Sequence, residues 1–169
     1  KVEWVEGKDV QRAGHFVAHR GDKGPHILLI GHLDTVFEPN SPFQKCEPLG
    51  ENRLHGPGLA DMKGGNLIAL QALAALHAAG TLDEITVTGI FTGDEEKAGR
   101  PISSARAALI DAAQKADIAI AFENGDHDPT TAVISRRGSS KWTITATGTP
   151  SHPPQIFRAD LRARAVYTM

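Results

Sequence analysis

The sequence predicts an α/β fold in which a mixed, mostly parallel sheet is flanked by helices. Three short apolar runs, at residues 26–30, 85–91 and 117–122, are apolar on both faces, which is typical of strands in a buried parallel sheet. Apolar residues at helical spacing fill residues 65–79 and 103–113, between those runs. This alternation of strand and helix predicts right-handed crossovers within one sheet.

The remaining elements of this region follow from turn residues and alternation. Residues 1–19 predict two short strands, around residues 2–5 and 14–18, with a turn at residues 7–9. Three prolines between residues 39 and 48 predict an irregular surface loop after the first buried strand. Gly80 supplies the stop signal of the first long helix.

The pattern changes after Gly138, which suggests a second domain. Residues 141–147 alternate apolar and polar side chains, which predicts an antiparallel strand with one face toward water. An Arg-rich amphipathic helix is expected after Pro154. We therefore expect one domain over residues 1–136 and the beginning of a small α+β domain over residues 137–169. Because the chain starts without Met and stops inside a predicted helix, we expect it to be cut at both ends.

Composition excludes several classes of function. The net charge of −2 and the pI of about 6.5 give no electrostatic reason to expect nucleic acid or an anionic membrane as a partner. No apolar stretch reaches the roughly 18 residues that a membrane-spanning helix needs. Cys46 is the single cysteine, so the chain has no internal disulfide and no thiolate zinc cluster. One unpaired cysteine favours a reducing compartment such as the cytoplasm, although secretion stays open.

Residues suited to metal binding follow each of the three buried strands. His32 and Asp34 come after the first strand, Glu95 and Glu96 after the second, and Glu123 after the third. In open α/β sheets, ligands bind beyond the carboxyl ends of the strands. We therefore expect these five side chains to meet at one edge of the sheet.

A glycine-rich segment at residues 56–65 adds another carboxylate, that of Asp61. Glycine permits the backbone angles with which a loop folds tightly around an ion, and one carboxylate can bridge two cations. The alternative, a phosphate-binding loop, is disfavoured because Asp61 would repel an anion and no dinucleotide or Walker motif is matched. One imidazole with several carboxylates suits a pair of zinc-like ions.

Each of these signals is ambiguous when it is taken alone. A lone His-x-Asp is more often a surface turn, and Asp-Glu-Glu is a common solvated helix start. Asp117, Asp126 and Asp128 compete with Glu123, which we prefer because it stands at the tip of its strand. His152 is equally compatible with an exposed turn. Surface positions are expected for the other histidines: His15, His19, His26, His55, His77 and His127.

Three motifs together carry a resemblance to a known family. They are Gly-His-x-Asp-Thr-Val at 31–36, Gly-Pro-Gly-x-Ala-Asp-Met-Lys-Gly-Gly at 56–65 and Asp-Glu-Glu at 94–96. With them, the chain resembles the zinc metallopeptidases and deacylases that include glutamate carboxypeptidase, acetylornithine deacetylase and succinyl-diaminopimelate desuccinylase. The resemblance runs from residue 26 to residue 153.

The resemblance implies a two-zinc site, with cobalt or manganese as possible replacements. On this match Asp61 bridges the ions, His32 and Glu123 complete the shell of one, and Glu96 binds the other. It also implies a cis peptide bond between Asp61 and Met62. The last metal ligand of the family, a downstream histidine, is expected beyond the end of this chain.

The resemblance further assigns catalytic roles. Glu95 would be the general base that takes a proton from the attacking water, and Asp34 would orient His32. His152 would lie in a small lid domain, reach the site of a partner subunit and stabilise the oxyanion. The usual small residues after that histidine are replaced here by Pro153 and Pro154, which is a departure from the family pattern.

The expected reaction is hydrolysis of an amide bond next to a carboxylate, in a small peptide or an N-acyl amino acid. The whole enzyme is expected to be a homodimer through its lid, and this chain by itself to be inactive. One alternative is a non-catalytic relative or fragment that serves in dimerisation or ligand binding. A nucleotide-binding α/β domain is another, and the acidic loops disfavour it.

Overall fold

The structure, a computed structural model, describes residues 1–125, 128, 130–135 and 137–147. The chain divides into two compact units, Lys1–Ala132 and Val133–Met169. Within the described ranges, every helix and strand belongs to the first unit. None of the helices in those ranges is both long and apolar enough to cross a membrane.

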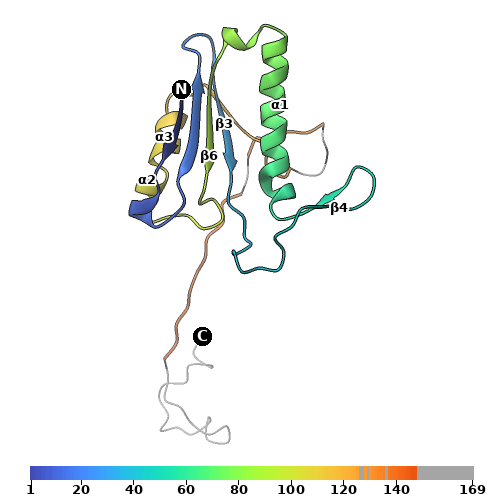
Figure 1. Ribbon diagram of the computed structural model, residues 1–169. Coiled ribbons are helices and arrows are strands. Elements are labelled where there is room, and N and C mark those ends of the chain that lie inside the picture. The colour runs from blue at the N-terminus through green and yellow to red at the C-terminus, as the bar shows by residue number, and fades with distance from the viewer. Residues whose placement is uncertain (126–127, 129, 136, 148–169) are drawn as a thin grey trace, which may run out of the picture. The chain divides into compact units, whose positions relative to one another are not determined.

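The first unit is built on a five-stranded sheet in the order β1-β2-β6-β3-β7 (Figure 1). The strands β6, β3 and β7 run parallel in its core, and β1 and β2 add an antiparallel edge. This arrangement confirms the predicted mixed sheet with a parallel core. The bounds are Val2–Val5 for β1, His15–Arg20 for β2, His26–His32 for β3, Thr86–Thr92 for β6 and Ile118–Ala121 for β7.

Helices cover both faces of this sheet (Figure 1). The long helix α1, Gly64–Ala78, lies on one face, as predicted. On the other face, the single helix expected over residues 103–113 is two helices, α2 (Ile102–Ala105) and α3 (Ala107–Ala113). They are separated at Arg106, whose backbone leaves helical geometry with φ −108° and ψ 11°. Short helical turns complete the unit: η1 at Lys8–Val10, η2 at Leu59–Lys63 and η3 at Leu82–Glu84.

The loop after β3 is more regular than the sequence predicts. Its strands β4 (Glu47–Pro48) and β5 (Leu54–His55) form a small antiparallel hairpin. Gly50 and Asn52 adopt positive φ in the turn between them, at 80° and 59°. These two residue types tolerate that conformation best, and they let the chain reverse there.

Strand register brings the carboxyl ends of the parallel strands together. His32 of β3 stands opposite Thr92 of β6, and Ile30 of β3 stands opposite Ala121 of β7. The segments that follow these three strands therefore leave the sheet at the same edge, as expected for a parallel core.

Helix α1 begins in close contact with the end of β7. A Cβ atom at Gly65 would lie 1.9 Å from the carbonyl oxygen of Phe122, so only glycine fits there. Further along the helix, Ala69 and Leu73 pack on Leu29 of β3 in the apolar core. The close approach of Gly65 to Phe122 places the glycine-rich segment beside the residues that follow β7.

The predicted strand at residues 141–147 is wrong. These residues form no regular structure, and Trp142 and Ile144 are 88% and 78% exposed. Alternation describes how a strand would present its side chains, but a strand also needs a neighbouring backbone to pair with, and none of the described strands pairs with this segment. The helix predicted after Pro154 lies outside the described residues.

Candidate metal centre

His32 is the buried centre of the candidate site. It ends β3 and is 1% exposed. Its Nε2 atom lies 3.0 Å from Oδ1 of Asp61 and 3.6 Å from Oε1 of Glu123. Its Nδ1 atom lies 3.0 Å from the backbone carbonyl of Asp34. A carbonyl oxygen only accepts, so Nδ1 carries a proton, and Nε2 is the atom that faces the carboxylates.

Asp61 reaches His32 from an irregular turn just before α1. Its peptide bond to Met62 is cis, as the resemblance implies. The side chain of Asp61 is 54% exposed, so it faces both the imidazole and solvent. The turn is held by its own segment, because Lys63 donates from its backbone to the Gly58 carbonyl at 2.9 Å and from Nζ to the Pro57 carbonyl at 2.7 Å.

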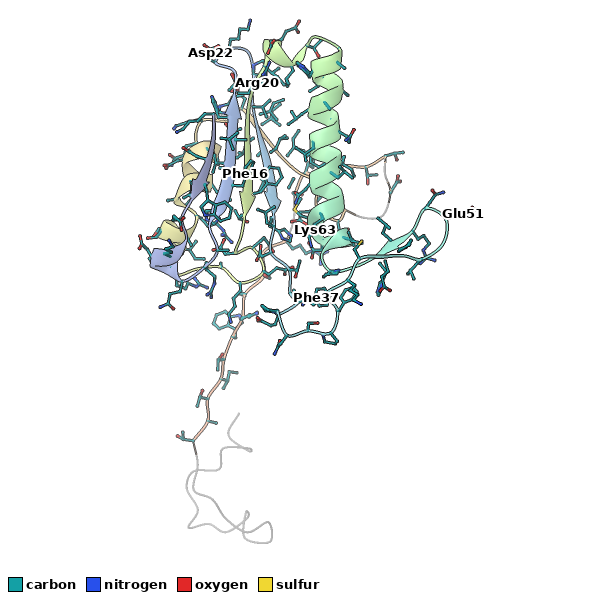
Figure 2. The ribbon with its side chains drawn as sticks, viewed as in Figure 1. Phe16, Arg20, Asp22, Phe37, Glu51 and Lys63 are labelled. Carbon is teal, nitrogen blue, oxygen red and sulfur yellow. The ribbon has the colours of Figure 1, made fainter. Side chains whose placement is uncertain are left out.

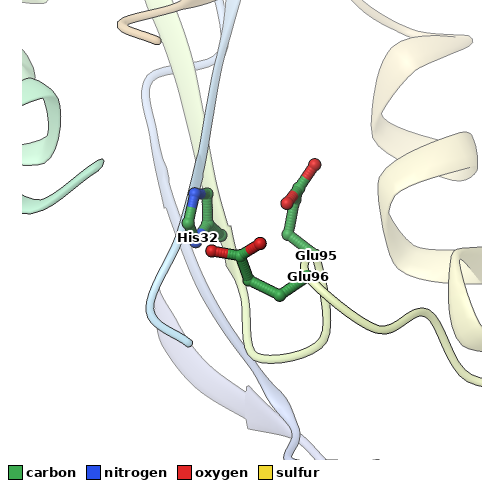
Figure 3. A group of neighbouring side chains, drawn as sticks. All are labelled: His32, Glu95 and Glu96. Carbon is green, nitrogen blue, oxygen red and sulfur yellow. The ribbon is translucent and has the colours of Figure 1, made fainter. Parts of the chain in front are cut away.

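Glu95 and Glu96 lie on the segment that follows β6, here called the acidic loop (residues 93–99). Figure 3 shows the carboxylate of Glu96 pointing toward the His32 ring, while the side chain of Glu95 runs in a different direction. Adjacent residues on an irregular loop can thus present two carboxylates with two separate roles.

Asp34 contacts both His32 and the acidic loop. Its carboxylate accepts hydrogen bonds from the backbone N–H groups of Glu95, at 3.1 Å, and Glu96, at 3.0 Å. The carboxylate was expected to orient the imidazole, but its Oδ1 is 3.5 Å from Nδ1 of His32, farther than the Asp34 carbonyl. Asp34 therefore orients the ring mainly through its backbone, and its charged group holds the loop.

Two groups of side chains have the composition and spacing to hold a metal ion. One is His32, Asp61 and Glu123, and the other is His32, Glu95 and Glu96. Within each group the ligand atoms all lie within 4.8 Å of one another. Nitrogen and carboxylate oxygen ligands at about 2.0–2.2 Å from a common ion fit inside that span. The donor set therefore fits divalent cations such as zinc.

The first group is the ligand set that the resemblance implies for one ion. For the second ion the resemblance pairs Asp61 with Glu96, whereas the spacing groups Glu96 with His32 and Glu95. Asp61 and Glu96 nevertheless line the same cavity and interact electrostatically. The pairing of Asp61 with Glu96 around a second ion stays a prediction.

Electrostatics show that this cluster favours added positive charge. Burial raises the pKa of Glu96, and the negative charges of Asp61 and Glu95 raise it further. Burial likewise raises the pKa of Glu123, although the nearby His32 opposes that shift. Burial by itself would lower the pKa of His32, but hydrogen bonds to Asp61 and to the Asp34 carbonyl, with nearby carboxylates, raise it overall. All three groups therefore hold protons more tightly than usual, and a bound divalent cation would offset the same negative charge.

A cavity of about 300 Å³ opens beside the carboxylates. Asp61 and Glu96 stand in its wall, and Phe37 and Phe43 contribute aromatic rings. Figure 2 shows Phe37 and Lys63 near this end of the sheet, with Arg20 at the opposite end. A larger cavity of about 560 Å³ lies between α1 and the sheet, but its lining is mostly apolar and includes none of the candidate ligands.

The sequence analysis missed Asn66, which supports the end of β3. Its Nδ2 atom donates to the carbonyl of His32 at 2.8 Å. Its Oδ1 atom is buried without a hydrogen-bond partner. An asparagine in the first turn of a helix that follows the glycine-rich motif was the available signal, but such a residue is also common on exposed turns.

The surface placement predicted for His15 is wrong. It is 4% exposed, and its ring is hydrogen-bonded on both sides. The period of two along β2 directs it, like Val17, to the sheet face that α2 and α3 cover. His26 is half-buried rather than exposed. His19, His55 and His77 are exposed as predicted, whereas His127 and His152 lie outside the described residues.

Comparison with known proteins agrees with this arrangement. The model of peptidase family M20/M25/M40 matches residues 28–165. Carboxypeptidase G2 of Pseudomonas sp. (strain RS-16) is 31% identical over 133 residues, which are 79% of this chain and 31% of that protein. Succinyl-diaminopimelate desuccinylase of Rhodospirillum centenum is 30% identical over 159 residues, 89% of this chain and 41% of that enzyme. The chain thus spans well under half the length of these relatives.

Proposed function

This chain belongs to peptidase family M20/M25/M40, and from that premise we propose that it supplies the metal-binding part of a hydrolase that cleaves an amide bond next to a carboxylate. The relatives, a carboxypeptidase and a succinyl-diaminopimelate desuccinylase, support this substrate class. A small peptide or an N-acyl amino acid is the proposed substrate. The observation that carries the proposal is the convergence of His32, Asp61 and Glu123 within one ligand span.

The proposed site holds two zinc ions. His32, Asp61 and Glu123 hold one, and Asp61 and Glu96 hold the other. When bound, such ions act as Lewis acids toward a carbonyl and lower the pKa of water. Cobalt and manganese are candidates for the same donors, because imidazole and carboxylate ligands accept several divalent metals.

In this proposal Glu95 moves the proton. One carboxylate oxygen of Glu95 lies within 4.8 Å of the ligand atoms of His32 and Glu96, and Glu95 is not a member of the His32–Asp61–Glu123 group. This spacing supports a role for Glu95 beside the metal ions rather than as a ligand of the first ion. Glu95 takes the proton of the attacking water and later delivers it to the leaving nitrogen. Asp34 supports this step by fixing the acidic loop through the amides of Glu95 and Glu96.

We further propose that residues 137–169 begin a lid domain through which the whole enzyme forms a homodimer. His152 would then stabilise the oxyanion from the partner subunit. The 169-residue chain alone is expected to be inactive, because it spans only 31% and 41% of the length of the two relatives. Measurable hydrolysis by the isolated chain would contradict this expectation.

Metal titration of the purified chain tests the proposal. Zn²⁺ or Co²⁺ should bind to the wild-type chain, and His32→Ala should remove the ion of the His32–Asp61–Glu123 site, because the imidazole supplies the nitrogen ligand of that group. Glu96→Ala should remove one ion and leave the His32–Asp61–Glu123 site. His77→Ala is the matched control, since His77 is exposed on α1. A wild-type chain that binds neither metal would overturn the proposal.

A test of the role of Glu95 requires activity measurements on the whole enzyme. Glu95→Gln should leave metal content unchanged and lower kcat by about 10²–10⁴-fold, the usual contribution of a general base. Metal binding by the whole protein without hydrolysis of any peptide or N-acyl amino acid would instead favour a non-catalytic ligand-binding relative.

A further inference from the structure

Asp94 is a buried carboxylate that the proposed mechanism does not use. It is 1% exposed and directly precedes Glu95. Arg106, from the junction of α2 and α3, forms an ion pair with its carboxylate and donates from Nη2 to its backbone carbonyl at 3.0 Å. The other carboxylate oxygen accepts the N–H of Gly99 at 2.9 Å. Arg106 therefore contacts both the side chain and the backbone of Asp94 in the acidic loop.

His15 holds the same loop from β2. Its Nε2 atom lies 2.8 Å from the carbonyl of Ala105, the residue before Arg106, so Nε2 must carry the proton. Its Nδ1 atom is then free to accept the N–H of Gly93, at 3.3 Å. The neutral imidazole thus joins the start of the acidic loop to the segment that presents Arg106.

These contacts, with those of Asp34, account for the backbone groups that surround the two glutamates. The N–H of residue 93, the carbonyl of residue 94 and the N–H groups of residues 95 and 96 are each held by a side chain from another element. Held at successive residues, the loop has little freedom to swing either carboxylate away from His32. Such preorganisation is what a metal site needs from its supporting residues.

We propose that Arg106 is a positioning residue that acts through Asp94, with His15 as its brace, to hold Glu95 and Glu96 toward His32. This inference rests on the proposed function, because it assigns the contacts of Arg106, Asp94 and His15 to the support of the metal site. It adds residues that contact no ligand group directly. The predicted consequence is selective. Loss of the contacts between Arg106 and Asp94 should weaken binding of the ion that Glu96 holds and leave binding of the His32–Asp61–Glu123 ion unchanged.

The main variant removes both charges of the Arg106–Asp94 ion pair at once. Arg106→Met alone leaves the buried Asp94 carboxylate unpaired and is expected to unfold part of the chain. The double variant Arg106→Met with Asp94→Asn avoids that charge and keeps an acceptor for Gly99. In Zn²⁺ and Co²⁺ titrations of the 169-residue chain, we expect it to bind the Glu96-held ion about 10–100-fold more weakly. The single variant Arg106→Lys should lose less affinity for this ion than the double variant does. Lysine keeps the positive charge beside Asp94 but lacks the two parallel N–H donors of arginine.

Hydrogen exchange of the metal-free chain supplies a second measurement. The amides of Glu95 and Glu96 should exchange faster in the double variant, while that of Ile90 in the middle of β6 should not change. The matched control is Arg20→Met with Asp83→Asn, which removes an exposed ion pair. It should alter neither metal binding nor exchange at Glu95.

The outcomes separate this inference from the proposed function. A wild-type chain that binds no divalent ion overturns the proposed function. A folded double variant that binds metal as the wild-type chain does, and whose Glu95 and Glu96 amides exchange no faster, overturns the positioning role of Arg106. An equal loss of affinity for both ions would also overturn it, since that result indicates general destabilisation of the chain.

Discussion

Two loops bring carboxylates to His32, and they are held in different ways. The glycine-rich segment that carries Asp61 is fixed by its own backbone and by Lys63 within the same segment. The acidic loop is fixed by His15, Arg106 and Asp34, which are distant in sequence. The first conformation is encoded locally, whereas the second depends on the completed fold. Substitutions should therefore act on the two loops in different ways.

The largest effect is expected where the glycine-rich segment meets β7. Gly65→Ala places a Cβ atom 1.9 Å from the Phe122 carbonyl, a backbone atom that cannot move aside alone. We expect a loss of about 3 kcal/mol in the free energy of unfolding, at the upper end of overpacking costs. Metal affinity should fall too, because Glu123 follows Phe122. Urea unfolding of the metal-free chain measures the first effect and zinc titration the second.

Gly125→Ala is the control for that substitution, since nothing lies within 4 Å of a Cβ atom there. It should change neither measurement. A Gly65→Ala chain of unchanged stability would mean that α1 and the end of β7 separate without cost, and the requirement for glycine at residue 65 would be wrong.

Removal of Asp34 should affect the acidic loop more than the Asp61 segment. In Asp34→Ala the N–H groups of Glu95 and Glu96 lose their shared acceptor, while the Asp34 carbonyl that holds His32 remains. We expect zinc affinity about 10–100-fold weaker for the ion that Glu96 holds. Calorimetric titration should show one weakened and one preserved site. Equal loss at both sites would show that Asp34 acts mainly through His32.

Metal affinity should rise with pH because metal replaces protons. The pKa of His32 is raised above its ordinary 6.5, and those of Glu96 and Glu123 above 4.5. Each displaced proton should change the apparent affinity by about tenfold per pH unit below the raised pKa. Zinc titrations at pH values above and below 6.5 measure the slope. An affinity independent of pH across that range would contradict the proposed ligand set.

The same shifts set the stability of the metal-free chain. A group with a raised folded pKa stabilises the fold while it is protonated. For His32 this contribution is complete below 6.5 and is lost as pH rises through the raised value. For Glu96 and Glu123 the loss begins near 4.5. Thermal melting of the metal-free His32→Gln chain should depend less on pH than that of the wild-type chain.

The smallest effect is expected for Lys63→Met. Its Nζ atom donates to the Pro57 carbonyl within the glycine-rich segment, and the contact is exposed. We expect a change below about 1 kcal/mol in the free energy of unfolding, because water replaces an exposed donor readily. Lys97→Met, on the acidic loop, is a matched exposed control. A large loss of zinc affinity in Lys63→Met would show that the Asp61 segment depends on this contact more than its backbone suggests.

Much of the sheet was predictable because its signals are local. The apolar runs of β3, β6 and β7 and the helical spacing of α1 each appear within a few residues. Residues 141–147 show the limit of that reasoning. Their alternation is as clear as that of a strand, yet pairing depends on a partner that alternation cannot reveal.

By itself the sequence determined which residues stand at the strand ends, and so His32, Glu95, Glu96 and Glu123 were identifiable as candidates for one edge. Only the tertiary structure decided how they are held. His15 and Arg106 had no local signal, because burial and ion pairing arise when β2 and the α2–α3 junction pack behind the acidic loop. Strand ends are set by short-range patterns, whereas a buried polar contact exists only after distant segments exclude water from it.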